Sequence, residues 1–342
     1  MSQGILRLVL LATSLGFGPG SDSRAQSVER FYANKTIEVI VGYAPGGGND
    51  LFGRAVAKHL GKHVPGSPAL IVQNVPGAGT FVATNRVFNS APRDGTVLAL
   101  AAPTIALDEK LGSDGVRFKT AQLGWVGRIT SRANHIMMWK TSPIKKIQDA
   151  LVTEATLAAT SASSTVSLYP NVLNNVIGTN FKLILGYGGS SESMLAMERG
   201  EAEGHSTSWE AVKSGHPDWL TNKDINIVVQ FGVQRHPAMP DVPSIMELAK
   251  NQDQKDILTA VMSTVEIGTS YFTTPSVPEE RLTALRKAFD ATMIDPDFVR
   301  DLEAVGVGVN PMRGEDLQKL VIEVSNLTPE LVEKVRAVYS VK

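Results

Sequence analysis

The chain has 342 residues, enough for about two domains, and its 43% hydrophobic content excludes a disordered or fibrous protein. Its 33 basic and 34 acidic residues leave a formal charge of -1 without a long basic block, so we expect no nucleic-acid partner. The absence of cysteine excludes disulfides, thiolate catalysis and zinc–cysteine sites.

The N-terminus has the pattern of a secretory signal peptide. Arg7 stands beside an apolar run over residues 8–15, which is too short to span a bilayer, and Ser23 and Ala25 are small residues of the kind that precede a signal-peptidase cut. We therefore expect residues 1–25 to be removed and the mature protein to be soluble in the periplasm. The alternative is a frayed amphipathic start of a cytoplasmic protein, since one basic residue precedes the run.

A strand and a helix are predicted first along the mature chain. Residues 37–43 form a short β-branched run bounded by Gly and Pro, which is typical of a buried parallel strand. From Asn49, apolar residues recur with helical spacing until Gly61. The same alternation continues at residues 69–74, 80–89, 97–101 and 125–129. This order predicts an α/β domain with a mainly parallel sheet.

A second series of elements begins at the apolar segment 135–139. Its predicted strands are at residues 157–160, 182–185, 202–206 and 225–231, with helices between them. The C-terminal part is helical, with an amphipathic helix at 279–293 and further helices from Pro296 and Arg313. We therefore place one lobe at residues 31–133 plus 263–342 and the other at residues 134–262. Two crossover segments would then form a hinge.

Two glycine-rich loops are the most informative local features. Residues 44–50, Ala-Pro-Gly-Gly-Gly-Asn-Asp, lie between a buried strand and a helix start, where glycines admit a ligand and free N–H groups favour an anion. Several such donors could hold a carboxylate without an arginine. By itself this loop is equally consistent with a tight turn. Residues 76–80 have the same position after the next strand, so both loops should face one crevice.

The second lobe offers hydroxyls and backbone donors at equivalent turns. Residues 160–165 are rich in Ser and Thr, and residues 187–191 read Tyr-Gly-Gly-Ser-Ser. Any single serine there could equally serve only as a helix cap.

Catalytic motifs are weak by comparison. The phosphate loop GxxxxGK[ST] and the nucleophile elbow GxSxG are absent, and Leu51 replaces the third glycine of a dinucleotide fingerprint. Ser142 and Lys145 fit SxxK without its companion motifs, while His59 and His63 lack a third metal ligand nearby. We predict no catalytic residues, no metal and no cofactor.

At these loops the chain resembles the receptors of tripartite tricarboxylate transporters, also called Bug proteins. The similarity runs from about Phe31 to Tyr339 and is most specific in IEVIVGYAPGGGND, IVQNVPGAGT, NSAPRDGTVLAL and PDVPS, with a looser match at FTTPSVPEERLTAL. It implies a type II periplasmic-binding-protein-like fold of two lobes that close on a carboxylate and deliver it to membrane permease subunits. We expect a monomer without enzymatic activity.

The resemblance assigns ligand-binding residues by matching positions. The first lobe contributes Gly46, Gly47, Gly48, Asn49 and Asp50 from one loop, and Pro76, Gly77, Ala78, Gly79 and Thr80 from the other. The second lobe contributes Ser161, Ser163, Ser164, Gly188, Gly189, Ser208 and Trp209. Related receptors often have Ser or Thr at the position of Gly48, Gly at that of Thr80 and Lys at that of Gly188, so the identity of the ligand stays open.

Some alternatives also stay open at this point. Asp50 could order water or receive an amino group, or it could simply favour the helix N-terminus. A sensory receptor that docks on a membrane kinase would share the same ligand site, and an α/β enzyme is a further, weaker alternative.

Overall fold

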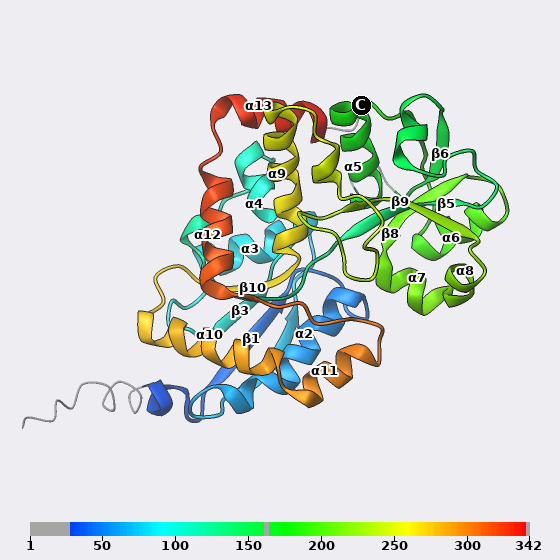
Figure 1. Ribbon diagram of the computed structural model, residues 1–342. Helices are drawn as coiled ribbons and strands as arrows, with labels where there is room; N and C mark the ends of the chain where they lie inside the picture. The colour runs from blue at the N-terminus through cyan, green and yellow to red at the C-terminus, as the bar shows by residue number, and fades with distance from the viewer. Residues whose placement is uncertain (1–27, 161–163, 340–342) are drawn as a thin grey trace, which may run out of the picture.

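A computed structural model describes residues 28–160 and 164–339, in which the chain forms two β-sheets flanked by helices (Figure 1). Sheet A has the strand order β11-β4-β10-β3-β1-β2, and sheet B has the order β7-β6-β8-β5-β9. Across these described ranges, no helix combines the length and apolar character needed to cross a bilayer.

Sheet A is built around β1 (Thr36–Val41), which pairs in parallel with β2 (Ala69–Asn74) and β3 (Val97–Leu100). Val39, Ile40 and Val41 of β1 are fully buried, as the β-branched run predicts for a central strand. The next strands are β4 (Gly124–Thr130), β10 (Thr269–Thr273) and β11 (Met312–Arg313). β10 lies antiparallel between β3 and β4, so the sheet is mixed while β1 to β4 all point the same way.

Sheet B has a similar design. Its strands are β5 (Asn134–Trp139), β6 (Ala155–Ala158), β7 (Phe181–Ile184), β8 (Gly204–Ser208) and β9 (Ile225–Phe231). β5 is antiparallel to β8 and β9, whereas β6 is parallel to β7 and β8. Both sheets are therefore mixed: most strands of each share one direction, whereas β5 in sheet B and β10 and β11 in sheet A run opposite to the others.

Helices cover both faces of each sheet (Figure 1). In the first part of the chain they are α2 (Gly48–His59), α3 (Phe81–Asn89) and α4 (Ile105–Leu111), and around sheet B they are α5 (Thr165–Val172), α6 (Ser190–Glu198), α7 (Trp209–Gly215) and α8 (Pro217–Thr221). Further helices are α9 (Gln252–Ile267), α10 (Glu279–Met293), α11 (Pro296–Glu303), α12 (Gly314–Ser325) and α13 (Pro329–Tyr339). On sheet A, Val39 and Val41 face the side that holds Phe52 of α2 and Phe289 of α10, while Ile40 faces the opposite core.

The chain passes between the sheets twice, and the two passages touch. Residues 131–133 connect β4 to β5, and the return from β9 runs through α9 into β10. The Arg132 backbone N–H donates to the Val265 carbonyl oxygen over 3.1 Å. α9 packs against α4, α12 and α13, and α13 also contacts α5, so helices from distant parts of the chain brace this connection.

Candidate functional site: a polar cleft between the sheets

A cavity of about 740 Å³ opens between the two sheets, within the size range of small-molecule sites. From sheet A and its helices it is lined by Tyr43, Gly48, Asn49, Phe52, Gly79, Thr104 and Thr269. From sheet B and its helices it is lined by Asn134, Ser164, Thr165, Tyr169, Ser190, Thr207, Ser208 and Glu210. Residues 131–133 of the first crossover complete the wall. Hydroxyl, amide and backbone groups share this surface with apolar side chains such as Phe52 and Val166.

The first glycine loop reaches this cavity through its last residues. β1 ends at Val41, and α2 begins at Gly48 with Gly47 as its N-cap. Gly48 and Asn49 line the cavity, so the first turn of α2, whose N–H groups lack partners within the helix, forms part of the cleft wall. A Cβ added at Gly48 would meet nothing within 4 Å, so this position leaves open space at the cleft wall.

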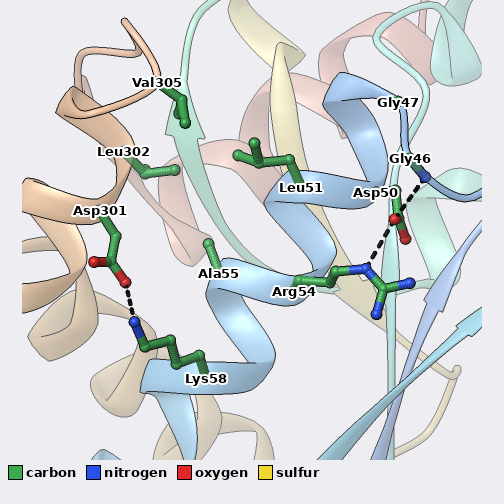
Figure 2. A pocket seen from close by; sticks show the side chains of 10 residues that line it. All are labelled: Gly46, Gly47, Asp50, Leu51, Arg54, Ala55, Lys58, Asp301, Leu302 and Val305. Atoms are coloured by element: carbon green, nitrogen blue, oxygen red, sulfur yellow. Dashed lines mark hydrogen bonds and ion pairs between the residues drawn. The ribbon is translucent and has the colours of Figure 1, made fainter.

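Gly46, Gly47 and Asp50 lie on the other side of this helix start. They line a separate groove between α2 and α11, which Figure 2 shows together with Arg54 and the Lys58–Asp301 ion pair. The described structure therefore divides the loop 44–50 between two surfaces, with Gly48 and Asn49 on the cleft side.

Asp50 holds the loop in place. Its carboxylate is buried and accepts hydrogen bonds from Gly46 N at 2.8 Å, Arg54 Nε at 2.8 Å and Asn74 Nδ2 at 2.9 Å. The hydrogen bond from Arg54, with those from Gly46 and Asn74, lowers the pKa of Asp50 from 3.8 to about 2 despite its burial. These three donors tie the loop to β2 and to the next turn of α2, and they occupy the oxygens that would otherwise receive a ligand.

The second loop is shaped by consecutive left-handed residues. Gly77, Ala78, Gly79 and Thr80 all have positive φ, with values of 145°, 44°, 62° and 83°. Non-glycine residues seldom adopt this region, so the loop stores local strain at Ala78 and Thr80. Gly79 lines the cavity, whereas Pro76, Gly77, Ala78 and Thr80 do not. Thr80 is buried instead and packs against Gly42. A Cβ added at Gly42 would lie 2.7 Å from the Cβ of Thr80.

The predicted residues of the second lobe are also divided. Ser164 lines the cavity at the N-cap of α5, and Ser208 does so at the N-cap of α7, where its side chain accepts a hydrogen bond from Ala211 N at 3.3 Å. Ser161 and Ser163 lie outside the described residues. Gly188, Gly189 and Trp209 do not line the cavity, although their neighbours Ser190 and Glu210 do.

Arg132 is the main feature that sequence reasoning missed. Its Nε donates to Thr269 Oγ1 at 2.9 Å, and its Nη2 donates to Asn49 Oδ1. The guanidinium carbon lies 5.7 Å from the centre of the Phe52 ring. Burial lowers the pKa of Arg132, but an arginine remains protonated in proteins. Within the described residues, no carboxylate forms an ion pair with Arg132. A mostly buried cation thus faces a polar cavity without a protein counter-charge.

The site has the layout of a binding cleft. Tyr43 and Tyr169 flank the cavity, and burial raises the pKa of both, to about 12 for Tyr169, so both phenols stay neutral near pH 7. Among residues 28–160 and 164–339, no group of three His, Asp or Glu side chains is placed to hold a metal. Two α/β sheets around such a cleft define a two-lobed solute-binding protein.

Comparison with known proteins defines the family. Residues 52–336 match the family model of the tripartite tricarboxylate transporter family receptor, TctC. The chain belongs to this family, which consists of substrate-binding receptors and not of enzymes. The resemblance seen in the glycine-rich loops is thereby confirmed. A UPF0065 protein from Cupriavidus necator is 26% identical over 232 residues, covering 66% of this chain and 67% of that protein.

Solved structures share the two-lobed fold. A TctC solute-binding protein from Polaromonas, without ligand, has a TM-score of 0.71 and 21% identity, over 89% of this chain and 99% of that one. An R. palustris protein solved with adipate has a TM-score of 0.59 and 20% identity, over 89% and 97% of the two chains. MatC from Rhodopseudomonas palustris with bound malate has a TM-score of 0.58 and 18% identity, over 87% and 99%.

Proposed function

We propose that this protein captures a small carboxylate in the cleft between its lobes and delivers it to the membrane subunits of a tripartite transporter. The observation that carries the proposal is the guanidinium of Arg132, which faces the cavity without a carboxylate partner among the described residues. A buried unpaired cation is costly, and a bound carboxylate would supply the missing charge.

The surroundings of Arg132 favour a carboxylate over other anions. Thr269 and Asn49 hold Nε and Nη2, and they thereby fix the plane of the guanidinium fork. A planar carboxylate can accept two parallel hydrogen bonds from such a fork. The start of α2 at Gly48 adds backbone N–H groups and the positive end of a helix dipole at the same wall.

The structural neighbours are consistent with this chemistry. Two proteins of the same fold have been solved with adipate and with malate, both small carboxylates. Their carboxylates support the same ligand class here, and the arginine explains how this chain would hold one.

Closure of two lobes around the ligand is the expected mechanism. We assign residues 31–133 plus 263–342 to one lobe and residues 134–262 to the other, so that the boundary at 262 falls within α9. The adjacent crossovers at Arg132 and Val265 would form the hinge. Asn49 and Thr269 on one side and Ser164 and Ser208 on the other would then enclose the ligand.

We further propose that the protein is exported to the periplasm, with cleavage after Ala25, and that it acts as a monomer. The intact mass of the secreted protein would test the cleavage position.

Calorimetric titration of small carboxylates tests the receptor role. The purified protein and its Arg132→Gln variant are titrated with mono-, di- and tricarboxylates, and Arg199→Gln, at an exposed arginine of the sheet B side, is the control. We expect at least one carboxylate to bind the unaltered protein and the control with equal affinity, and Arg132→Gln to weaken it by about 10-fold or more, since a charge-assisted hydrogen bond contributes ~1.5 to 3 kcal/mol. Failure of every carboxylate to bind, or equal binding by Arg132→Gln, would overturn the proposal.

A further inference from the structure

The cavity carries a balanced pair of charges. Of the described side chains that line it, Arg132 and Glu210 are the two that are charged at neutral pH, since the remainder are neutral polar or apolar. A ligand with two or three carboxylates would bring surplus negative charge close to Glu210.

The two charged residues leave neighbouring strands at the same edge of sheet B. Asn134 at the start of β5 pairs with Ser208 at the end of β8, and both line the cavity. Arg132 lies two residues before Asn134, and Glu210 lies two residues after Ser208. The antiparallel register thus places the arginine and the glutamate just beyond the same end of two neighbouring strands.

Although both line one cavity, the two side chains do not pair with each other. Thr269 and Asn49, both from the sheet A side, hold the Arg132 guanidinium. Glu210 makes no ion pair and no side-chain hydrogen bond to any described residue. Opposite charges that share one cavity but stay apart provide two separate anchoring points for a ligand that carries both signs.

We propose that the ligand is an amino carboxylate, with its carboxylate on Arg132 and its ammonium group on Glu210. This inference rests on the proposed function and narrows its ligand class. Glu210 also stands in the first turn of α7, where any carboxylate favours the helix dipole. Asp218 has the same kind of position in the first turn of the neighbouring α8, is exposed and does not line the cavity, so it provides a matched control.

Ligands of equal length that differ at one end test the proposal. Calorimetry compares hexanoate, 6-aminohexanoate and adipate, together with the shorter series propionate, β-alanine and malonate. Each compound is titrated into the full-length mature protein and into Glu210→Gln, Asp218→Asn and Arg132→Gln. In the series that binds more tightly, we expect the amino acid to bind about 10-fold or more tightly than the dicarboxylate. Glu210→Gln should remove most of that preference, whereas Asp218→Asn should leave it unchanged.

The outcomes separate this inference from the receptor role itself. If the dicarboxylate binds as tightly as the amino acid, or if Glu210→Gln leaves their ratio unchanged, the amino carboxylate assignment is wrong while an Arg132-dependent carboxylate receptor stands. If none of the six acids binds in an Arg132-dependent way, the amino carboxylate assignment is wrong, and the wider titration of mono-, di- and tricarboxylates decides the receptor role separately.

Discussion

Arg132 Nε donates a hydrogen bond to Thr269 Oγ1 over 2.9 Å, and so joins the crossover that leaves sheet A to the strand that returns to it. Thr269 is buried and lines the cleft beside Arg132. Thr269→Val keeps the side-chain shape but removes the hydrogen-bond acceptor. We expect it to weaken carboxylate binding by about three- to tenfold, because the guanidinium loses one of the two hydrogen bonds that orient it, which contributes ~1 kcal/mol to the binding free energy. Calorimetric titration measures the loss.

A second threonine of the same strand provides the control. Thr273 is also buried, and its Oγ1 donates to the Val97 carbonyl oxygen at 2.7 Å, but it does not line the cavity. Thr273→Val should lower the free energy of unfolding by about 1 kcal/mol and leave affinity unchanged. Equal effects of the two substitutions on affinity would show that the Arg132–Thr269 contact has no special role in binding.

The two glycines of the loop 76–80 should respond differently to substitution. Gly79 has φ of 62°, which asparagine tolerates, and an added Cβ meets nothing within 4 Å on the cavity wall. We expect Gly79→Asn to lower affinity by 10-fold or more by filling ligand space, with a change in unfolding free energy within about 1 kcal/mol. Ligand titration and denaturant unfolding measure the two quantities.

Gly77 is the matched position in the same loop. Its φ of 145° suits glycine, and an added Cβ would lie 2.8 Å from Val82 Cγ2. Gly77→Ala should therefore cost about 2 kcal/mol of folding stability through strain and overlap. A Gly79→Asn protein that binds with normal affinity, or a Gly77→Ala protein of normal stability, would contradict this division of roles.

Local patterns predicted most elements because those elements depend on local chemistry. The β-branched run at 37–43 was expected to be a buried strand, and β1 occupies Thr36–Val41. The helix expected from Asn49 begins at Gly48. The ends of strands were predicted less accurately, since the strand expected at 202–206 is β8 at Gly204–Ser208. The position of β10 between β3 and β4 depends on partners more than a hundred residues away, which periodicity does not specify.

The same limit explains which part of the site was predicted. Glycines before a helix start pointed to Gly48, Asn49 and Gly79, and these three line the cavity. Arg132 stands in a short connection without periodicity or motif, so nothing local distinguishes it. Its role emerges when Asn49, 83 residues away, and Thr269, 137 residues away, meet at its guanidinium. The one signal in the sequence is that Arg132 lies in the connection between the two predicted sheets.

Acid should weaken the fold through Asp50. The pKa of Asp50 is lowered from 3.8 to about 2 in the folded protein, mainly by its hydrogen bond from Arg54. Between these values the unfolded chain binds more protons than the folded one, so a fall in pH favours unfolding. The stabilisation from Asp50 is therefore complete above about pH 5 and is lost as pH falls through about 2. We expect Asp50→Asn to be less stable than the unaltered protein at pH 6, and the difference to shrink towards pH 2.

Denaturant unfolding at steps between pH 6 and pH 2 measures this difference. Other carboxylates titrate equally in both proteins, so their contributions cancel in the comparison. Asp114 is exposed and makes no side-chain hydrogen bond to the described residues, so Asp114→Asn should match the unaltered protein throughout the series. A gap between Asp50→Asn and the unaltered protein that stays constant down to pH 2 would mean that the contacts to Gly46, Arg54 and Asn74 do not depend on the charge of Asp50. The loop would then be held by shape alone.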